Sequence, residues 1–130
     1  MSAAKILIDD YDNYASSVHC SYYGCFQYIK HKLNQLGHTY EQIDLAIQQS
    51  KDSKGVILST HGYPLQLIQK ELTAKYNDSG FLAREIKDKV KLLKAFRTLS
   101  DYHNEIVDYD KGKKALTLSN EVLNIIKTKL

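Results

Sequence analysis

The sequence predicts an all-α protein, built as an up-and-down bundle of four main helices plus one or two short helices. Apolar residues recur at intervals of three and four along most of the chain, which is the period of a helix face buried against a core. Proline occurs once and glycine six times in 130 residues, so few residues interrupt helices. No apolar–polar alternation persists long enough to indicate a strand. We therefore expect residues 1–130 to form a single domain.

The first half of the chain predicts a long helix flanked by two short ones. Residues 3–11 are expected to form a short first helix. Asn13 is expected to cap the second helix, which runs to Leu36 and is closed by Gly37. A third, short helix is expected over residues 40–49, with Ile43, Leu45 and Ile47 as its apolar residues. The long helix carries its apolar stripe at helical spacing, namely Val18, Tyr22, Cys25, Ile29, Leu33 and Leu36.

The second half predicts three further helices separated by polar connectors. The connectors are residues 51–55, 77–80 and 108–112. Ser59 or Thr60 is expected to cap the first of these helices, which begins around residues 60–64 and in which Pro64 suits the first turn. The next two helices are expected over residues 81–102 and 113–130. The expected core residues are Leu65, Ile68, Leu72, Tyr76, Leu82, Ile86, Val90, Leu93, Phe96, Leu116, Val122, Leu123 and Ile126.

The composition limits which cellular compartment and which binding partners we expect. Cys20 and Cys25 are five residues apart on one predicted helix, about 140° around its axis, which disfavours a disulfide between them. With no secretory leader and no apolar run of about 18 residues, we expect a cytoplasmic protein without a membrane span. The net charge of +3 is too small to establish nucleic-acid binding. Ten of the 13 aromatic residues are tyrosines, which hints at self-association.

The densest group of reactive side chains lies at the end of the 81–102 helix. The stretch Arg97-Thr98-Leu99-Ser100-Asp101-Tyr102-His103 holds a permanent cation, a carboxylate, a phenol and an imidazole. Cleavage of RNA without a metal needs a group that takes the 2′-OH proton and a cation that holds the phosphate. The imidazole of His103 titrates near neutrality, and the planar guanidinium of Arg97 suits a phosphate.

Three segments and the closing helix resemble the HEPN superfamily of small helical domains. Residues 16–26 contain small residues and the pair Tyr22-Tyr23, as in the second helix of the family. Ser59-Thr60-His61-Gly62 resembles the start of its third helix. Residues 97–102 resemble its Arg-x-x-Ala-Asp-Tyr signature, with Ser100 in place of alanine, and residues 110–130 match its closing helix.

The resemblance implies a helical bundle that often dimerises across the faces bearing the arginine motif. Many members are metal-independent endoribonucleases, frequently toxins paired with a nucleotidyltransferase-like antitoxin, and their motif is Arg followed after four to six residues by His. By resemblance, Arg97 and His103 are the catalytic residues and Asp101, Tyr102 and Asn104 support them. The resemblance predicts RNA as a partner and a homodimer, with neither a metal nor a cofactor.

A non-catalytic reading remains open. Some family members serve as interaction or nucleotide-binding modules that bind a nucleotidyltransferase-like partner. Arg97 and Asp101 are spaced as an ordinary i,i+4 ion pair. On an unbroken helix, Arg97 and His103 lie about 120° apart, so they converge only where the helix ends between them. Thr98 also stands where ribonucleases of the family usually carry Asn, Asp or His.

Other polar residues have two interpretations. His61 either caps its helix, which we favour from the sequence, or joins the motif cleft. Tyr22 and Tyr23 either stack bases or, as their helical spacing favours, form a core or dimer face. The cations of the 81–102 helix either face solvent or steer a polyanion; they are Arg84, Lys87, Lys89, Lys91 and Lys94. His19, Cys20, Cys25 and His31 have no spacing typical of a closed metal site.

Overall fold

Five helices make up the part of the chain that the structure, a computed structural model, describes. It describes residues 14–52, 55, 57–102 and 109–130, with the side chains of residues 14–16 and 99–102 left aside. The helices are α2 (Tyr14–Gln35), α3 (Tyr40–Asp52), α4 (Gly62–Lys75), α5 (Phe81–Tyr102) and α6 (Tyr109–Lys129). No strand occurs within these ranges. The predicted all-α bundle is confirmed, while the short helix expected over residues 3–11 lies outside the described residues.

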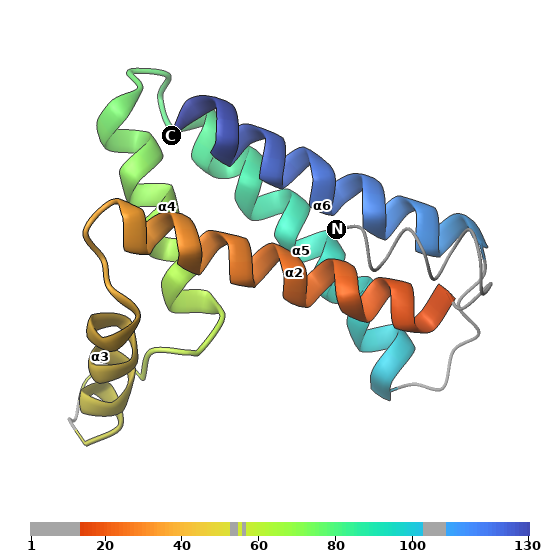
Figure 1. The fold of residues 1–130 in the computed structure, drawn as a ribbon, viewed down its shortest axis with the longest axis horizontal. Helices are drawn as coiled ribbons and strands as arrows, with labels where there is room; N and C mark the ends of the chain where they lie inside the picture. Colours follow the sequence, from red (N-terminus) through yellow and green to blue (C-terminus); the bar gives the residue numbers. More distant parts are fainter. Residues whose placement is uncertain (1–13, 53–54, 56, 103–108) are drawn as a thin grey trace.

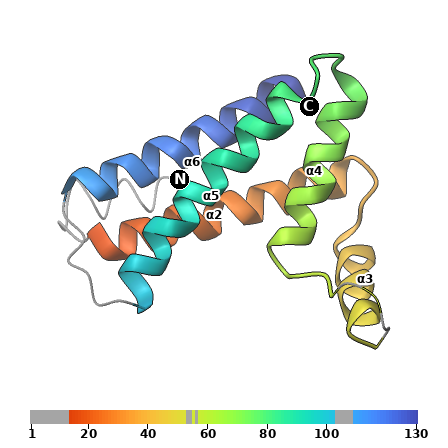
Figure 2. The same cartoon turned by 180° about the vertical axis from the view of Figure 1, so that it is seen from behind.

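Three long helices form the body of the bundle. Helices α2, α5 and α6 run side by side, and α5 runs in the direction opposite to the other two (Figure 1). Helix α4 crosses one end of this group, and α3 extends beyond α4 (Figure 2). None of the described helices is both long enough and apolar enough to cross a membrane. This arrangement brings the beginning of α4 toward α2 and α5, where the candidate site lies.

The core follows the predicted stripes closely. Buried side chains from all five helices form one cluster, among them Val18, Tyr22, Ile29, Leu33, Ile43, Ile68, Leu72, Ile86, Leu93 and Ile126. The prediction is wrong for Leu36 of the apolar stripe, which is exposed, and Leu45 of the short helix is exposed as well. Leu36 follows the end of α2, and Leu45 belongs to α3, where Ile43 and Ile47 are the buried apolar residues.

Small residues allow α2 and α6 to pack closely. Ser119 Oγ of α6 donates a buried hydrogen bond of 3.0 Å to the carbonyl oxygen of Ser21 in α2. Gly112 and Ala115 are buried on the same helix. The polar connector predicted over residues 108–112 is therefore wrong for residues 109–112, which form the first turn of α6. Burial of Gly112 within the fold offsets its low helix propensity.

Local hydrogen bonds mark the end of α2 and the beginnings of α3 and α5. Gly37, at φ +103°, closes α2 as predicted, and His38 N donates to Leu33 O at 2.8 Å in the pattern of a Schellman motif. Thr39 and Gln42 form a reciprocal capping box at the start of α3. Asp78 accepts backbone N–H groups at the start of α5. Helix α3 continues to Asp52, so the connector predicted from residue 51 begins later than expected.

Candidate functional site

Arg97 is held against two neighbouring tyrosines of α2. Its Nη2 donates a hydrogen bond of 2.9 Å to the phenol oxygen of Tyr23. Its guanidinium carbon lies 5.0 Å from the ring centroid of Tyr22 and 5.2 Å from that of Tyr23, within the range of cation–π attraction. Both tyrosines therefore position the cation, in agreement with their assignment to a packed face. The side chain of Asp101 lies outside the described residues, so its ion pair with Arg97 stays a prediction.

His61 belongs to the same group of side chains. Its Nδ1 lies 3.0 Å from the phenol oxygen of Tyr22, and its ring stacks on Phe26 at 4.6 Å between centroids. His61 occupies the N-cap position of α4, as favoured from the sequence, but its side chain makes no capping hydrogen bond. Ser59 takes that role, since its Oγ accepts a hydrogen bond of 2.7 Å from Gly62 N. The side chain of His61 is thereby left to the tertiary contact with α2.

The surroundings of His61 and Tyr22 shift the pKa values of these two side chains in opposite directions. Burial, followed by the positive charges of Arg97, Lys30 and Lys94, lowers the pKa of His61 below its ordinary value of 6.5. Burial raises the pKa of Tyr22 above 10.0, and the neighbouring Arg97 partly offsets this rise. At neutral pH the site therefore holds a neutral imidazole beside a protonated phenol and a permanent cation.

These side chains border a cavity of about 360 Å³ between α2, the beginning of α4, and α5, which we call the Arg97 pocket. Four cations of α5 line it, and no carboxylate is among the described residues around it. Lys87 and Arg97 are ten residues apart, so the cations extend over about 15 Å of helix. The lining residues are Tyr22, Phe26, Ser59, Thr60, His61, Gly62, Leu65, Lys87, Val90, Lys91, Lys94 and Arg97.

Some cations of α5 line the Arg97 pocket, and others make contacts elsewhere. Lys87, Lys91 and Lys94 line the Arg97 pocket. Lys89 instead forms ion pairs with Glu121 of α6 and Glu85 of its own helix. Arg84 Nη1 donates to the carbonyl oxygen of Ser79 at 2.7 Å, and its side chain is otherwise exposed. The expectation of a solvated face thus holds for Arg84 and also for Lys87, Lys91 and Lys94, which are exposed while they line the pocket.

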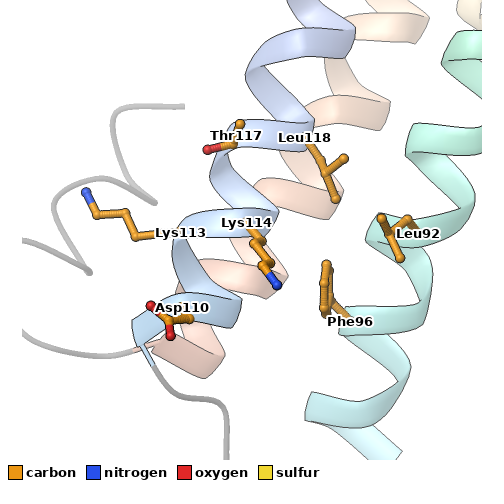
Figure 3. A pocket seen from close by; sticks show the side chains of 7 residues that line it. All are labelled: Leu92, Phe96, Asp110, Lys113, Lys114, Thr117 and Leu118. Atoms are coloured by element: carbon orange, nitrogen blue, oxygen red, sulfur yellow. The ribbon is translucent and has the colours of Figure 1, made fainter.

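A second cavity lies on the opposite face of α5. It has a volume of about 380 Å³ and is bordered by α5 and α6. Figure 3 shows Leu92 and Phe96 of α5 facing Leu118 of α6, with Lys114 beside Phe96. Asp110 also borders this cavity, so its walls carry both signs of charge. Its apolar floor and mixed charge suit a polyanion less well than the Arg97 pocket does.

Of the residues predicted to form the site, the structure places one side chain. That side chain is Arg97. Asp101 and Tyr102 belong to the last turn of α5, with side chains outside the described part. His103 and Asn104 also lie outside it. The convergence of Arg97 and His103 therefore stays a prediction.

Two features of the pocket were missed or misassigned from the sequence. The favoured interpretation gave His61 a capping role, and the grouping of the exposed lysines Lys87, Lys91 and Lys94 at one cavity was not predicted. The i, i+4, i+7 spacing of Lys87, Lys91 and Lys94 is the signal that they share a helix face. Comparison with models of protein families, with curated proteins and with solved structures gives no match. The functional argument therefore depends on the geometry of the Arg97 pocket.

Proposed function

We propose that this chain is a HEPN-like domain that binds RNA in the Arg97 pocket and cleaves it without a metal, as an endoribonuclease or toxin component. The observation that carries the proposal is the concentration of four cations in one cavity, with no carboxylate among the described lining residues. Sequence-independent binding of RNA depends on neutralising phosphates with such side chains. A volume of about 360 Å³ also falls within the range of small-molecule pockets, about 300–1,000 Å³.

The chemistry of the pocket suits a phosphodiester. A guanidinium stabilises the charge that develops on phosphate oxygens during displacement at phosphorus, most strongly where solvent is partly excluded. Arg97 is half-buried and oriented by Tyr23, so little reorganisation is needed before it contacts a phosphate. Lys91 and Lys94, one turn apart on the same face of α5, are suited to the neighbouring phosphates of the strand.

The resemblance supplies the rest of the proposal. His103 would contribute an acid or base from the Arg-x5-His motif, with Asp101, Tyr102 and Asn104 supporting it. The active form would be a homodimer in which two motifs meet. The protein would act in the cytoplasm, where a nucleotidyltransferase-like antitoxin would be its partner.

A non-catalytic module is the second candidate, and one contact favours it. The guanidinium of Arg97 is engaged with Tyr22 and Tyr23 of α2, so Arg97 can stabilise a binding face without reacting with a substrate. In this alternative, the same pocket holds a nucleotide or contributes to the surface that contacts a nucleotidyltransferase-like protein. Binding without cleavage distinguishes this alternative from the ribonuclease.

The test is cleavage of a mixed single-stranded RNA pool in the presence of a chelator. We expect wild type to cleave, and Arg97→Ala to slow cleavage by roughly 10²–10³-fold because one donor to the phosphate is lost. Arg97→Lys keeps the charge and serves as the control for a folding defect in Arg97→Ala. Arg84→Ala removes an arginine of the same helix outside the pocket and is expected to behave as wild type. RNA that is bound but left intact would favour the non-catalytic module; RNA neither bound nor cleaved would contradict the ribonuclease.

A further inference from the structure

We propose that His61 is the general base of the Arg97 pocket and takes the proton of the RNA 2′-OH that attacks the phosphate. This inference rests on the proposed ribonuclease function and adds a catalytic residue from a different helix. The Arg-x5-His motif points to His103 instead. His61 lies 36 positions before Arg97 in the sequence, yet both border the same cavity.

The first step of the argument is how the ring of His61 is held. Phe26 stacks on one face at 4.6 Å with an interplanar angle of 27°. The phenol of Tyr22, 3.0 Å from Nδ1, fixes the rotation of the ring. No described residue makes a hydrogen bond with the other ring nitrogen, Nε2. A base oriented by a third group through one nitrogen, with the second available for a substrate, is the arrangement that activates a hydroxyl nucleophile.

The second step is the charge around the imidazole. Helix α2 contributes Tyr22, Tyr23 and Lys30, while α5 contributes Lys94 and Arg97. The three cations and burial act together to keep His61 neutral at neutral pH, because they lower its pKa. A general base must be unprotonated before the reaction, so this environment prepares His61 for that role. It also predicts that the base stays active somewhat below pH 6.5.

The third step is the reaction itself. With Tyr22 accepting from Nδ1–H, Nε2 of His61 removes the 2′-OH proton while the 2′ oxygen forms a bond to phosphorus. The bond from phosphorus to the 5′ oxygen breaks, and that oxygen takes a proton from water. The imidazolium then returns its proton to the hydroxide left by that water. The products are a 2′,3′-cyclic phosphate and a 5′-hydroxyl end, and no oxidant or metal takes part.

The experiment measures single-turnover cleavage of a labelled single-stranded RNA between pH 5 and pH 8, with chelator present. We expect His61→Asn to reduce the rate by roughly 10²–10⁴-fold, as the loss of a general base does. Its affinity for the RNA should change by less than about threefold, because a residue that acts only in the transition state contributes little to ground-state binding. His31→Asn is the matched control, since His31 is exposed and bonds only Gln35 among the described residues.

The pH profile gives an independent readout. In wild type, the rate should fall with acid along a limb whose midpoint coincides with the titration of His61 followed by NMR. That comparison needs no variant, so a folding defect in His61→Asn leaves the proposal testable. A midpoint that differs from the titration of His61 by more than about one pH unit would overturn it.

The outcomes separate the two proposals. Wild type that cleaves, with His61→Asn as fast as His31→Asn, would overturn the role of His61 and leave the ribonuclease standing. If His103→Asn abolished cleavage while His61→Asn did not slow it, the base would be assigned to the motif instead. Wild type that leaves the RNA intact would overturn both the ribonuclease and the role of His61.

Discussion

The phenol oxygen of Tyr22 lies 3.0 Å from Nδ1 of His61, and this contact joins α2 to the start of α4 across 39 positions of sequence. Tyr22 is fully buried, and the contact also borders the Arg97 pocket. One hydrogen bond thus contributes to the core and orients the imidazole. The stability of the bundle and the geometry of the site are coupled at this point.

Replacing Tyr22 by Phe tests that coupling. The change removes the hydroxyl and leaves Nδ1 of His61 without this partner, which should lower the free energy of unfolding by about 1–3 kcal/mol in chemical denaturation. Tyr28→Phe is the matched control on the same helix, because no described residue bonds the Tyr28 hydroxyl, and its effect should stay within about 0.5 kcal/mol. Equal effects of the two substitutions would contradict the proposed contribution of the Tyr22 hydroxyl.

Gly62 is tested by a double-mutant cycle with Ser59. A Cβ at position 62 would lie 2.4 Å from Ser59 Oγ, so Gly62→Ala forces the serine out of its capping position. We expect Gly62→Ala to lose less stability than Ser59→Ala, which should lose about 1 kcal/mol, because the helix propensity of alanine partly offsets the loss of the same cap.

The double variant shows whether alanine at position 62 is unfavourable because it clashes with Ser59 or for another reason. With Ser59 already replaced by Ala, Gly62→Ala should be neutral or stabilising by up to about 1 kcal/mol, since alanine favours a helix over glycine. Additive losses in thermal or chemical unfolding would show that alanine at position 62 is unfavourable for another reason.

The lowered pKa of His61 predicts how stability depends on pH. The unfolded state binds a proton near pH 6.5, whereas the folded state binds it only at lower pH, so neutral His61 favours folding above pH 6.5. That contribution is lost as the pH falls below 6.5 toward the lower pKa of the folded state. Denaturant titrations at pH 5.5 and 7.5 should therefore show that acidification destabilises wild type more than His61→Asn. An equal loss in both proteins would contradict the burial of His61.

The two thiols should differ in reactivity. Burial raises the pKa of Cys25 to about 12, so its thiolate is scarce at neutral pH and is also shielded from reagents. Cys20 is half-buried. At pH 8 we expect a thiol reagent to modify Cys20 first and Cys25 only after unfolding. Cys20→Ser should abolish the fast phase; two thiols that react together in the folded protein would contradict the assignment.

The helices could be predicted from sequence because their signals are local. The period of Val18, Tyr22, Cys25 and Ile29 defines the buried face of α2, and Gly37 marks its end. The first turn of α6 was missed because Gly112 reads as a connector until its burial is known. Packing at a helix interface is not encoded in the propensity of the residue itself.

The site was harder to predict because it depends on contacts between distant segments. Arg97 stands out from its chemistry and its motif alone. Ser59, Thr60 and His61 are successive residues with polar side chains, so the local sequence cannot decide which one caps α4. The contact with Tyr22 makes that choice, and it appears only when α2 and α4 are placed together.

The most direct test of the central claim, that the Arg97 pocket binds RNA, is the salt dependence of binding to a single-stranded RNA. Lys91→Ala combined with Lys94→Ala removes two cations of the pocket. Lys89→Ala combined with Lys87→Ala removes one pocket cation and one that is paired with Glu121. We predict that the first pair lowers the slope of log affinity against log salt by about 1.4 and the second by about 0.7. Slopes equal to that of wild type in both double variants would contradict the claim.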